Sequence, residues 1–195
     1  MSNSREQLLA RVKQNQPSIT PLPNLGVLGS YDFEILEKYK ETLKGIGGNA
    51  IEVNSEEEVI AYIKEHYPAD SRVITTLPAF ESLAEPNWQN LDPHDLESVD
   101  LTIIKAHFGV AENSALWVTE ELLGQRVAPF ITQYLIMLVN ASDILPTMHQ
   151  AYDRIAQSEY GYGAFIAGPS KTADIEQSLV IGAHGPRGLN VFIIK

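Results

Sequence analysis

The sequence predicts an α/β fold with a mainly parallel central sheet flanked by helices. One observation is the order of segments between residues 49 and 75, where an apolar run, a helical pattern and a second apolar run follow one another as in a β-α-β unit. Another is the run from Tyr134 to Val139, the strongest strand pattern in the chain. The third is a closing apolar run at residues 191–194, which predicts a buried last strand.

The first thirty residues are predicted to form a separate helix and linker. Residues 4–14 place their apolar side chains on one helical stripe, which we expect to dock as an arm on the body or on a neighbouring subunit. Residues 15–30 contain several prolines and glycines and therefore predict an extended linker. The predicted division is an N-terminal helix and linker over 1–30 and a single domain over 31–195.

Helix and strand patterns alternate along the first half of this domain. The helices are predicted from apolar periodicity, and the strands from short apolar runs bounded by turn residues. In chain order we expect a helix at 32–44, a strand at 49–53, a helix at 55–66 capped by Ser55, and a strand at 72–75. The next stretch, residues 78–95, is rich in proline and poor in periodic apolar residues, which predicts an irregular excursion.

Strand patterns dominate the second half of the domain. In chain order we expect strands at 101–106, 108–110, 115–118 and 134–139, then a helix from Ala141 to Ile155, and finally a strand that Gly161 and Gly163 open. That strand leads into the C-terminal segment. No internal repeat or low-complexity segment interrupts this order.

Composition excludes several classes of function. Of 195 residues, 44% are hydrophobic and 20% are charged, which is typical of a folded globular protein. The net charge of −11, without a basic cluster, argues against nucleic acid or an anionic membrane as partner. The lack of cysteine excludes disulfides, thiolate catalysis and cysteine-bound metal clusters in this chain. The histidines lack metal-ligand spacing, and with no signal or spanning segment we expect a cytoplasmic protein without membrane insertion.

The C-terminal segment from Gly168 onward predicts a loop, a short helix, a second loop and the closing strand. Ser170 or Thr172 is placed to cap this helix, and its N-terminal N–H groups would favour an anion. His184 and Arg187 would add an imidazole and a guanidinium near the same rim. The same residues also fit a purely structural role, with glycine and proline forming turns and the hydroxyls only capping.

The string GPSKTADIEQSLVIGAHGPRGLNVFII, residues 168–194, resembles the C-terminal signature of the LUD domain family, the lactate-utilisation proteins C and their relatives. The resemblance implies an α/β fold related to the sugar-phosphate isomerase and CoA-transferase class. It also implies a role in oxidation of L-lactate to pyruvate, beside two iron–sulfur proteins encoded in the same operon. Since this chain has no cysteine, it would be the cluster-free subunit, with no cofactor of its own.

A second segment, residues 107–117, is similar to the family's Ala-Glu-(Thr/Asn)-Gly-(Thr/Ala) stretch, which resembles strand ends that line the pocket in the CoA-transferase class. By analogy, Glu112 is the carboxylate nominated as nucleophile or base. By pattern alone, Glu112 and Asn113 could equally form only a hairpin tip. The small-carboxylate site that the resemblance suggests comprises Asn113, Ser114, Gly168, Pro169, Ser170, Lys171, Thr172, Asp174, His184, Gly185 and Arg187.

Three positions depart from the family pattern. Ser114 stands where many relatives carry Gly, and a turn that accepts Ser need not adopt a positive φ. His107 stands where many carry Asp, so any carboxylate role there is lost. Tyr134 stands where members often carry His, and its ordinary pKa near 10 favours hydrogen bonding over acid–base chemistry.

Three functions remain open from the sequence. The leading one is the cluster-free subunit of a lactate-oxidising complex that binds a small carboxylate at the signature. The second is a stand-alone enzyme that acts on an acyl-CoA, a sugar phosphate or a folate and uses Glu112. The third is a non-catalytic scaffold whose signature only packs against the sheet. Any of them is compatible with a homo-oligomer.

Overall fold

The computed structural model describes residues 3–21, 31–156, 158–172 and 180–195. The chain divides into two units, Met1–Ser30 and Tyr31–Lys195. In the first unit, α1 (Ser4–Gln14) forms where a helix was predicted, and Asn3 and Glu6 build a capping box at its N-terminus. None of its residues is buried. No helix within the described ranges combines the length and apolar character needed to cross a membrane.

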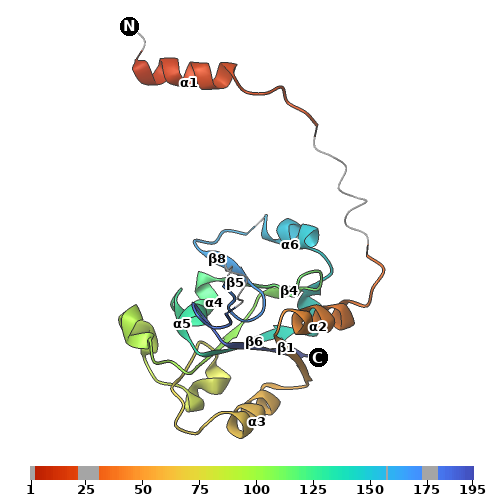
Figure 1. The fold of residues 1–195 in the computed structure, drawn as a ribbon, viewed down its shortest axis with the longest axis vertical. Coiled ribbons are helices and arrows are strands. Elements are labelled where there is room, and N and C mark those ends of the chain that lie inside the picture. The colour runs from red at the N-terminus through yellow and green to blue at the C-terminus, as the bar shows by residue number, and fades with distance from the viewer. Residues whose placement is uncertain (1–2, 22–30, 157, 173–179) are drawn as a thin grey trace. The chain divides into compact units, whose positions relative to one another are not determined.

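The second unit is built on a central sheet in which every neighbouring pair of strands is parallel, which confirms the predicted fold class (Figure 1). Its strands are β1 (Asn49–Val53), β2 (Val73–Thr75), β3 (Leu101–Lys105), β6 (Tyr134–Asn140) and β9 (Gly188–Ile194). They lie in the order β1-β9-β6-β3-β2, so the last strand of the chain inserts between β1 and β6. This insertion brings the C-terminal signature, which leads into β9, to the amino ends of the central strands.

Apolar side chains cover both faces of the central sheet. The helix α2 (Ile35–Gly45) lies on one face and α3 (Glu56–His66) on the other (Figure 1). Along β6 the odd-numbered side chains pack with α2 and the even-numbered ones with α3, and residues 135–139 are all buried. Burial on both faces explains why this strand is an uninterrupted apolar run, without the alternation of a half-exposed strand.

A second, smaller sheet lies over the α2 face of the central sheet. Its strands, in the order β7-β4-β5-β8, are β7 (Ile144–Leu145), β4 (Phe108–Val110), β5 (Leu116–Thr119) and β8 (Gly163–Ile166). Its inner face shares the apolar core with α2, and α6 (Met148–Ile155) covers its outer face. Figure 1 shows α3 below the central sheet, with the second sheet and α6 above it.

The helix predicted from Ala141 to Ile155 is wrong in its first half. Ala141–Asp143 forms a 3₁₀ turn (η5), and the next two residues pair with β4 as β7. The helix α6 begins only at Met148. Pro146 accounts for the break, because it has no N–H to donate and disfavours helical backbone at the residue before it.

The other helices and strands predicted for residues 31–166, and the closing strand, form with shifts of a few residues at their ends. The irregular excursion contains three 3₁₀ turns, η2 (Pro78–Leu83), η3 (Trp88–Asn90) and η4 (Pro93–Leu96). Buried Trp88 fixes it to the sheet, since its Nε1–H donates to the Thr75 carbonyl at 2.9 Å. Two short helices that were not predicted, α4 (Glu120–Leu123) and α5 (Ala128–Ile131), lie between β5 and β6.

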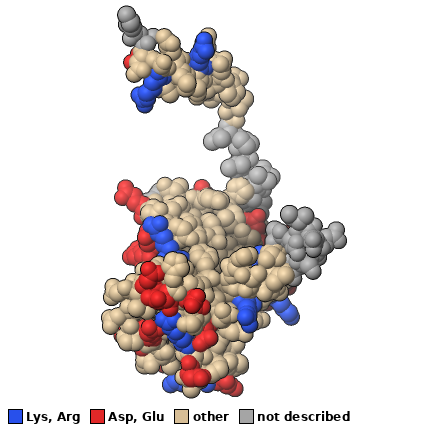
Figure 2. All heavy atoms as spheres, turned by 60° about the vertical axis from the view of Figure 1, so that its left-hand side comes forward, with Lys and Arg blue, Asp and Glu red and all other residues tan. Residues whose placement is uncertain are grey.

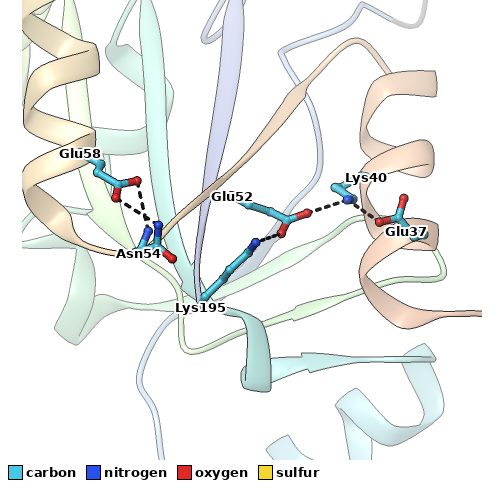
Figure 3. A network of polar contacts seen from close by, with 6 residues as sticks. All are labelled: Glu37, Lys40, Glu52, Asn54, Glu58 and Lys195. Carbon is cyan, nitrogen blue, oxygen red and sulfur yellow. Dashed lines mark hydrogen bonds and ion pairs between the residues drawn. The ribbon is translucent and has the colours of Figure 1, made fainter.

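An ion-pair network ties the carboxyl ends of β1 and β9 to α2 (Figure 3). Lys195 Nζ lies 2.8 Å from Glu52 Oε2, and Lys40 Nζ lies 2.6 Å from Glu52 Oε1 while also contacting Glu37. Hydrogen bonds from Lys195 and then Lys40 lower the pKa of the Glu52 carboxyl to about 2. The network occupies the edge of the central sheet opposite to the signature.

Candidate functional site

The signature loop consists of two described arms, residues 168–172 and 180–187, that lie side by side. Ser170 N–H donates to the Pro186 carbonyl at 2.9 Å, and Gly182 N–H donates to the Ser170 carbonyl at 3.0 Å. Between these bonds Lys171 and Ile181 form an antiparallel bridge. The second arm is fixed to the sheet because Arg187 N–H donates to the Gln133 carbonyl at 2.8 Å. The loop is therefore anchored at the amino end of β6.

The helix that Ser170 or Thr172 was predicted to cap falls largely within 173–179, so the predicted capping lies outside the described residues. Thr172 N–H donates to the Val180 carbonyl at 3.1 Å, so Val180, expected within the helix, pairs across to the first arm. The expectation that the N–H groups of Gly168 to Thr172 face an anion is wrong for Ser170 and Thr172, since both donate to carbonyls. Asp174 and the rest of 173–179 lie outside the described residues.

Glycines at the loop's turns allow the two arms to meet. Gly168 has φ +71° and Gly182 has φ +79°, a backbone region that favours glycine. Gly168 packs against Ile46 at the end of α2, where an added Cβ would come within 2.9 Å of a side-chain carbon. Gly185 packs against Ser170, whose Cβ would lie 3.1 Å from an added Cβ. The predicted Gly168, Ser170 and Gly185 thus shape the loop, and buried Pro169 packs beside Gly47.

The basic side chains of the signature loop are exposed. Lys171, His184 and Arg187 are exposed, and none of them forms an ion pair or side-chain hydrogen bond with a described residue. Arg187 starts from a fixed backbone and runs past Gly182, where an added Cβ would lie 2.5 Å from its Cγ. An arginine guanidinium stays protonated at physiological pH and offers paired donors to a carboxylate. This loop can therefore bind a small anion through its side chains.

The Glu112 turn, residues 112–114, is a hairpin tip between β4 and β5 whose side chains are used locally. Glu112 Oε2 accepts the Met148 N–H at 2.8 Å and so caps the start of α6. Asn113 Oδ1 accepts the Ala115 N–H at 3.1 Å. Ser114 is buried and donates to the Asn113 carbonyl at 2.7 Å. These bonds give each member of the turn a structural role.

Ser114 adopts a positive φ of 56°, although its presence had indicated that the turn need not do so. The turn keeps the backbone that suits the glycine of many relatives, at a cost of about 1–2 kcal/mol for a residue with a Cβ. The hydroxyl bond to Asn113 offsets part of this cost. Within the described residues, no hydrogen bond or ion pair joins the turn to the signature loop, so the two predicted halves of the site are not linked directly.

Tyr134 lies in a cavity of about 720 Å³ at the amino edge of the central sheet. Its ring meets Tyr67 edge to face, with centroids 5.8 Å apart. Asn190 Nδ2 donates to the Tyr67 hydroxyl at 3.2 Å, and Asn49 Nδ2 donates to Asn190 Oδ1 at 3.1 Å. Burial raises the pKa of Tyr67. The cavity thus combines the hydrogen-bonding groups of Tyr67, Asn190 and Asn49 with the carboxylates of Asp70 and Asp100, which also line it.

A further cavity of about 560 Å³ was not predicted as a site. It lies between the second sheet and α6 and contains His107, whose Nε2 is 2.7 Å from Thr119 Oγ1. Burial lowers the pKa of the His107 imidazole. A signal was present in the sequence, because His107 follows a strand at its carboxyl end, where α/β proteins often bind ligands.

The described residues contain no group of three or more His, Asp or Glu side chains placed to hold a metal ion. On the face in Figure 2, acidic and basic side chains are interspersed.

Comparison with known proteins identifies the family. The sequence model of the LUD domain matches residues 91–194. Lactate utilization protein C of Bacillus velezensis is 32% identical over 117 residues, which cover 56% of this chain and 47% of the relative. Lactate utilization protein C of Bacillus subtilis is 32% identical over 116 residues, with the same shares. The chain matches about half the length of these relatives.

A solved structure agrees with the fold. The crystal structure of a DUF162 family protein from Deinococcus radiodurans has a TM-score of 0.58 and 16% identity, covering 83% of this chain and 96% of that one. At such identity the likeness supports the α/β architecture alone. The match to the sequence model of the LUD domain, in contrast, spans more than half of the sequence and includes the signature loop and the Glu112 turn. The chain therefore belongs to the LUD domain family.

Proposed function

We propose that this chain serves lactate utilisation as a cluster-free subunit that binds a small carboxylate at the signature loop. The names of its relatives, lactate utilization protein C, support the process. The lack of cysteine is consistent with iron–sulfur clusters that reside in two partner proteins, where electron transfer would occur. This chain would then position the substrate or product and exclude competing anions.

The observation that carries the proposal is the free guanidinium of Arg187 on an anchored loop. Its backbone N–H is bonded to Gln133, and no described residue neutralises its charge. A carboxylate can accept two parallel N–H donors from it. His184 and Lys171 supply further donors from the two arms. Because the arms are already paired, binding need not first order this backbone.

Catalysis by Glu112 has weaker support. Its carboxylate would have to release the Met148 N–H before acting as a nucleophile or base.

The first test of the proposal concerns partner proteins. A tagged chain is recovered from its own cells grown on lactate, and the eluate is assayed for lactate oxidation. Co-elution of two cysteine-rich iron–sulfur proteins with activity is expected, whereas a partnerless, inactive eluate would contradict the subunit assignment.

The second test concerns the site. In the reconstituted complex, Arg187→Ala should raise the Michaelis constant for lactate at least tenfold, because the paired hydrogen bonds to a carboxylate are lost. Arg187→Lys keeps the charge but not the planar pair of donors, and an intermediate value is expected. A Michaelis constant and turnover unchanged in Arg187→Ala would remove Arg187 from the site while leaving the partner assignment intact.

A further inference from the structure

The cavity that contains His107 lies on a different part of the domain from the signature loop. Its walls come from β4, β5, α4, α6 and residues 158–161, and none of the described signature residues lines it. Its volume of about 560 Å³ falls in the range of small-molecule sites. Neither the carboxylate site nor the packing of the two sheets uses this cavity.

Aromatic rings form one side of the cavity. Trp117 contacts Tyr160 edge to face, with ring centroids 5.2 Å apart, and stacks with Phe108 at 6.5 Å. Gly163 permits the position of Trp117, because an added Cβ would lie 2.4 Å from the indole ring. The face of Phe108 already carries one cation, since the guanidinium carbon of Arg154 lies 5.0 Å from the ring centroid. These rings suit contacts with positive charge.

The charges around the cavity leave an excess of carboxylate. Arg154 is neutralised by Asp143 at 3.1 Å, and Glu120 is paired with Arg126, which donates two hydrogen bonds at 2.9 and 3.0 Å. The two remaining lining carboxylates, Glu121 and Glu159, form no ion pair with any described residue. The lining charge is therefore negative.

His107 and Thr119 add no positive charge of their own to the cavity. His107 contacts Thr119, which is buried, and burial holds the imidazole pKa below its ordinary value, so the ring is mainly neutral at pH 7. Glu121 partly opposes this shift and Arg154 adds to it, so both charges lie near the ring, and the Arg154 charge is paired with Asp143. A neutral imidazole and a hydroxyl can hydrogen-bond a polar ligand atom without repelling its charge.

We infer that this cavity binds an organic cation, an ammonium head on a small body. The head would lie against Trp117 and Tyr160 and near Glu121 and Glu159, and a polar group on the body would reach His107. Aromatic rings and carboxylates attract an ammonium ion by cation–π and Coulomb interactions, whereas a neutral molecule of the same shape gains neither. The site takes the opposite charge from the proposed carboxylate site and does not depend on it.

Choline is a suitable probe, with 3,3-dimethyl-1-butanol as its neutral isostere. The chain has two tryptophans, so each indole N–H gives one resonance in a ¹H–¹⁵N spectrum, and Trp88 serves as the internal reference. Choline, at constant ionic strength, should shift the Trp117 resonance saturably and leave Trp88 unchanged. The isostere should bind at least tenfold more weakly. Absence of a saturable shift, or equal binding of both probes, would overturn the inference.

Variants separate charge from shape. Glu121→Gln with Glu159→Gln should weaken choline binding at least tenfold. A control with the same change in net charge, Glu41→Gln with Glu65→Gln, removes exposed carboxylates from α2 and α3 and should leave affinity unchanged. Equal loss in both double variants would reduce the effect to general electrostatics and overturn the site. For the ring, Tyr160→Phe should retain binding and Tyr160→Ala should weaken it several-fold.

Discussion

The signature loop and the Glu112 turn carry similar polar residues, yet the two regions use them differently. In the Glu112 turn, Glu112 caps α6, Asn113 accepts a neighbouring N–H, and Ser114 is buried. In the signature loop, the backbone makes the bonds, while Arg187 and His184 leave their side chains exposed and unpaired with described residues. The turn therefore uses its side chains within the fold, whereas the loop leaves the charge of Arg187 without a partner among the described residues.

The comparison shows that a polar motif does not by itself indicate a site. What distinguishes the two regions is the number of hydrogen-bonding groups still unused after folding. A buried polar group must be satisfied, so its partners are fixed by the fold. An exposed cation on a fixed backbone needs no hydrogen-bond partner within the fold. The predictions below test this division, beginning with the largest expected effect.

Ser114→Val should destabilise the protein by about 2–4 kcal/mol, because a β-branched residue must adopt a positive φ in a packed site. Ser114→Gly should keep the stability within about 1 kcal/mol, since glycine adopts this backbone without strain. Urea unfolding of both variants gives the two free energies. Similar losses for Val and Gly would show that the hydroxyl, and not the backbone, determines stability here.

Glu112→Ala should cost about 1 kcal/mol, because the N–H of Met148 loses its acceptor at the start of α6. Glu112→Gln retains an amide oxygen and should lose less. Thermal unfolding at several scan rates provides the comparison. A stable Glu112→Ala variant that has lost ligand binding would reverse the division drawn here and restore Glu112 to the site.

Glu52 tests a third region, the network at the opposite edge of the sheet (Figure 3). Its folded pKa of about 2 is below its ordinary value, so its ionised form stabilises the fold above about pH 4.5. That contribution is lost as the pH falls from there towards 2. At pH 7 the free energy of unfolding of wild type should exceed that of Glu52→Gln by about 1 kcal/mol, since such partly exposed ion pairs contribute little to stability. Urea titrations at pH 7 and pH 3 should show the difference shrinking, and a constant difference would contradict the assignment.

Arg187→Ala should change the free energy of unfolding by less than about 0.5 kcal/mol, because the side chain is exposed and makes no bond to a described residue. The backbone bond to Gln133 remains in the variant. Urea unfolding of wild type and Arg187→Ala measures this change in the free energy of unfolding. A loss near 2 kcal/mol would mean that Arg187 is structural, like the residues of the Glu112 turn.

Local patterns were enough for the central sheet. The run at 135–139 is apolar because both faces of β6 are buried, and the segments around 49–75 alternate as a β-α-β unit must. For the second sheet, local patterns predicted the strands β4, β5 and β8, but neither β7 nor the pairing of these strands in a separate sheet. Its strand β7 has two residues, and it forms only because β4, more than thirty residues earlier, pairs with it. The apolar periodicity of residues 141–155 therefore predicted one helix, although its first half contains β7, which ends before Pro146.

The site was predictable in its residue types and not in their use. The N–H groups of Ser170 and Thr172 were expected to face an anion, yet they donate to carbonyls of the second arm of the loop, eight or more residues further along the chain. Glu112 resembles a reactive carboxylate until the helix start at Met148 is known. His107 drew notice only as a departure from a family pattern, because its cavity depends on α6 and on residues 158–161. Such contacts are set by tertiary packing.

The most direct test of the account is a titration of the purified chain with L-lactate, followed by calorimetry and by ¹H–¹⁵N spectra. Wild type and Glu112→Gln should bind lactate saturably and alike, with shifts confined to the signature loop. Arg187→Lys should bind more weakly, Arg187→Ala should not bind, and the neutral analogue lactamide should bind to none of them. Undiminished lactate binding by Arg187→Ala, or loss of binding in Glu112→Gln alone, would contradict the division between a structural turn and a ligand-binding loop.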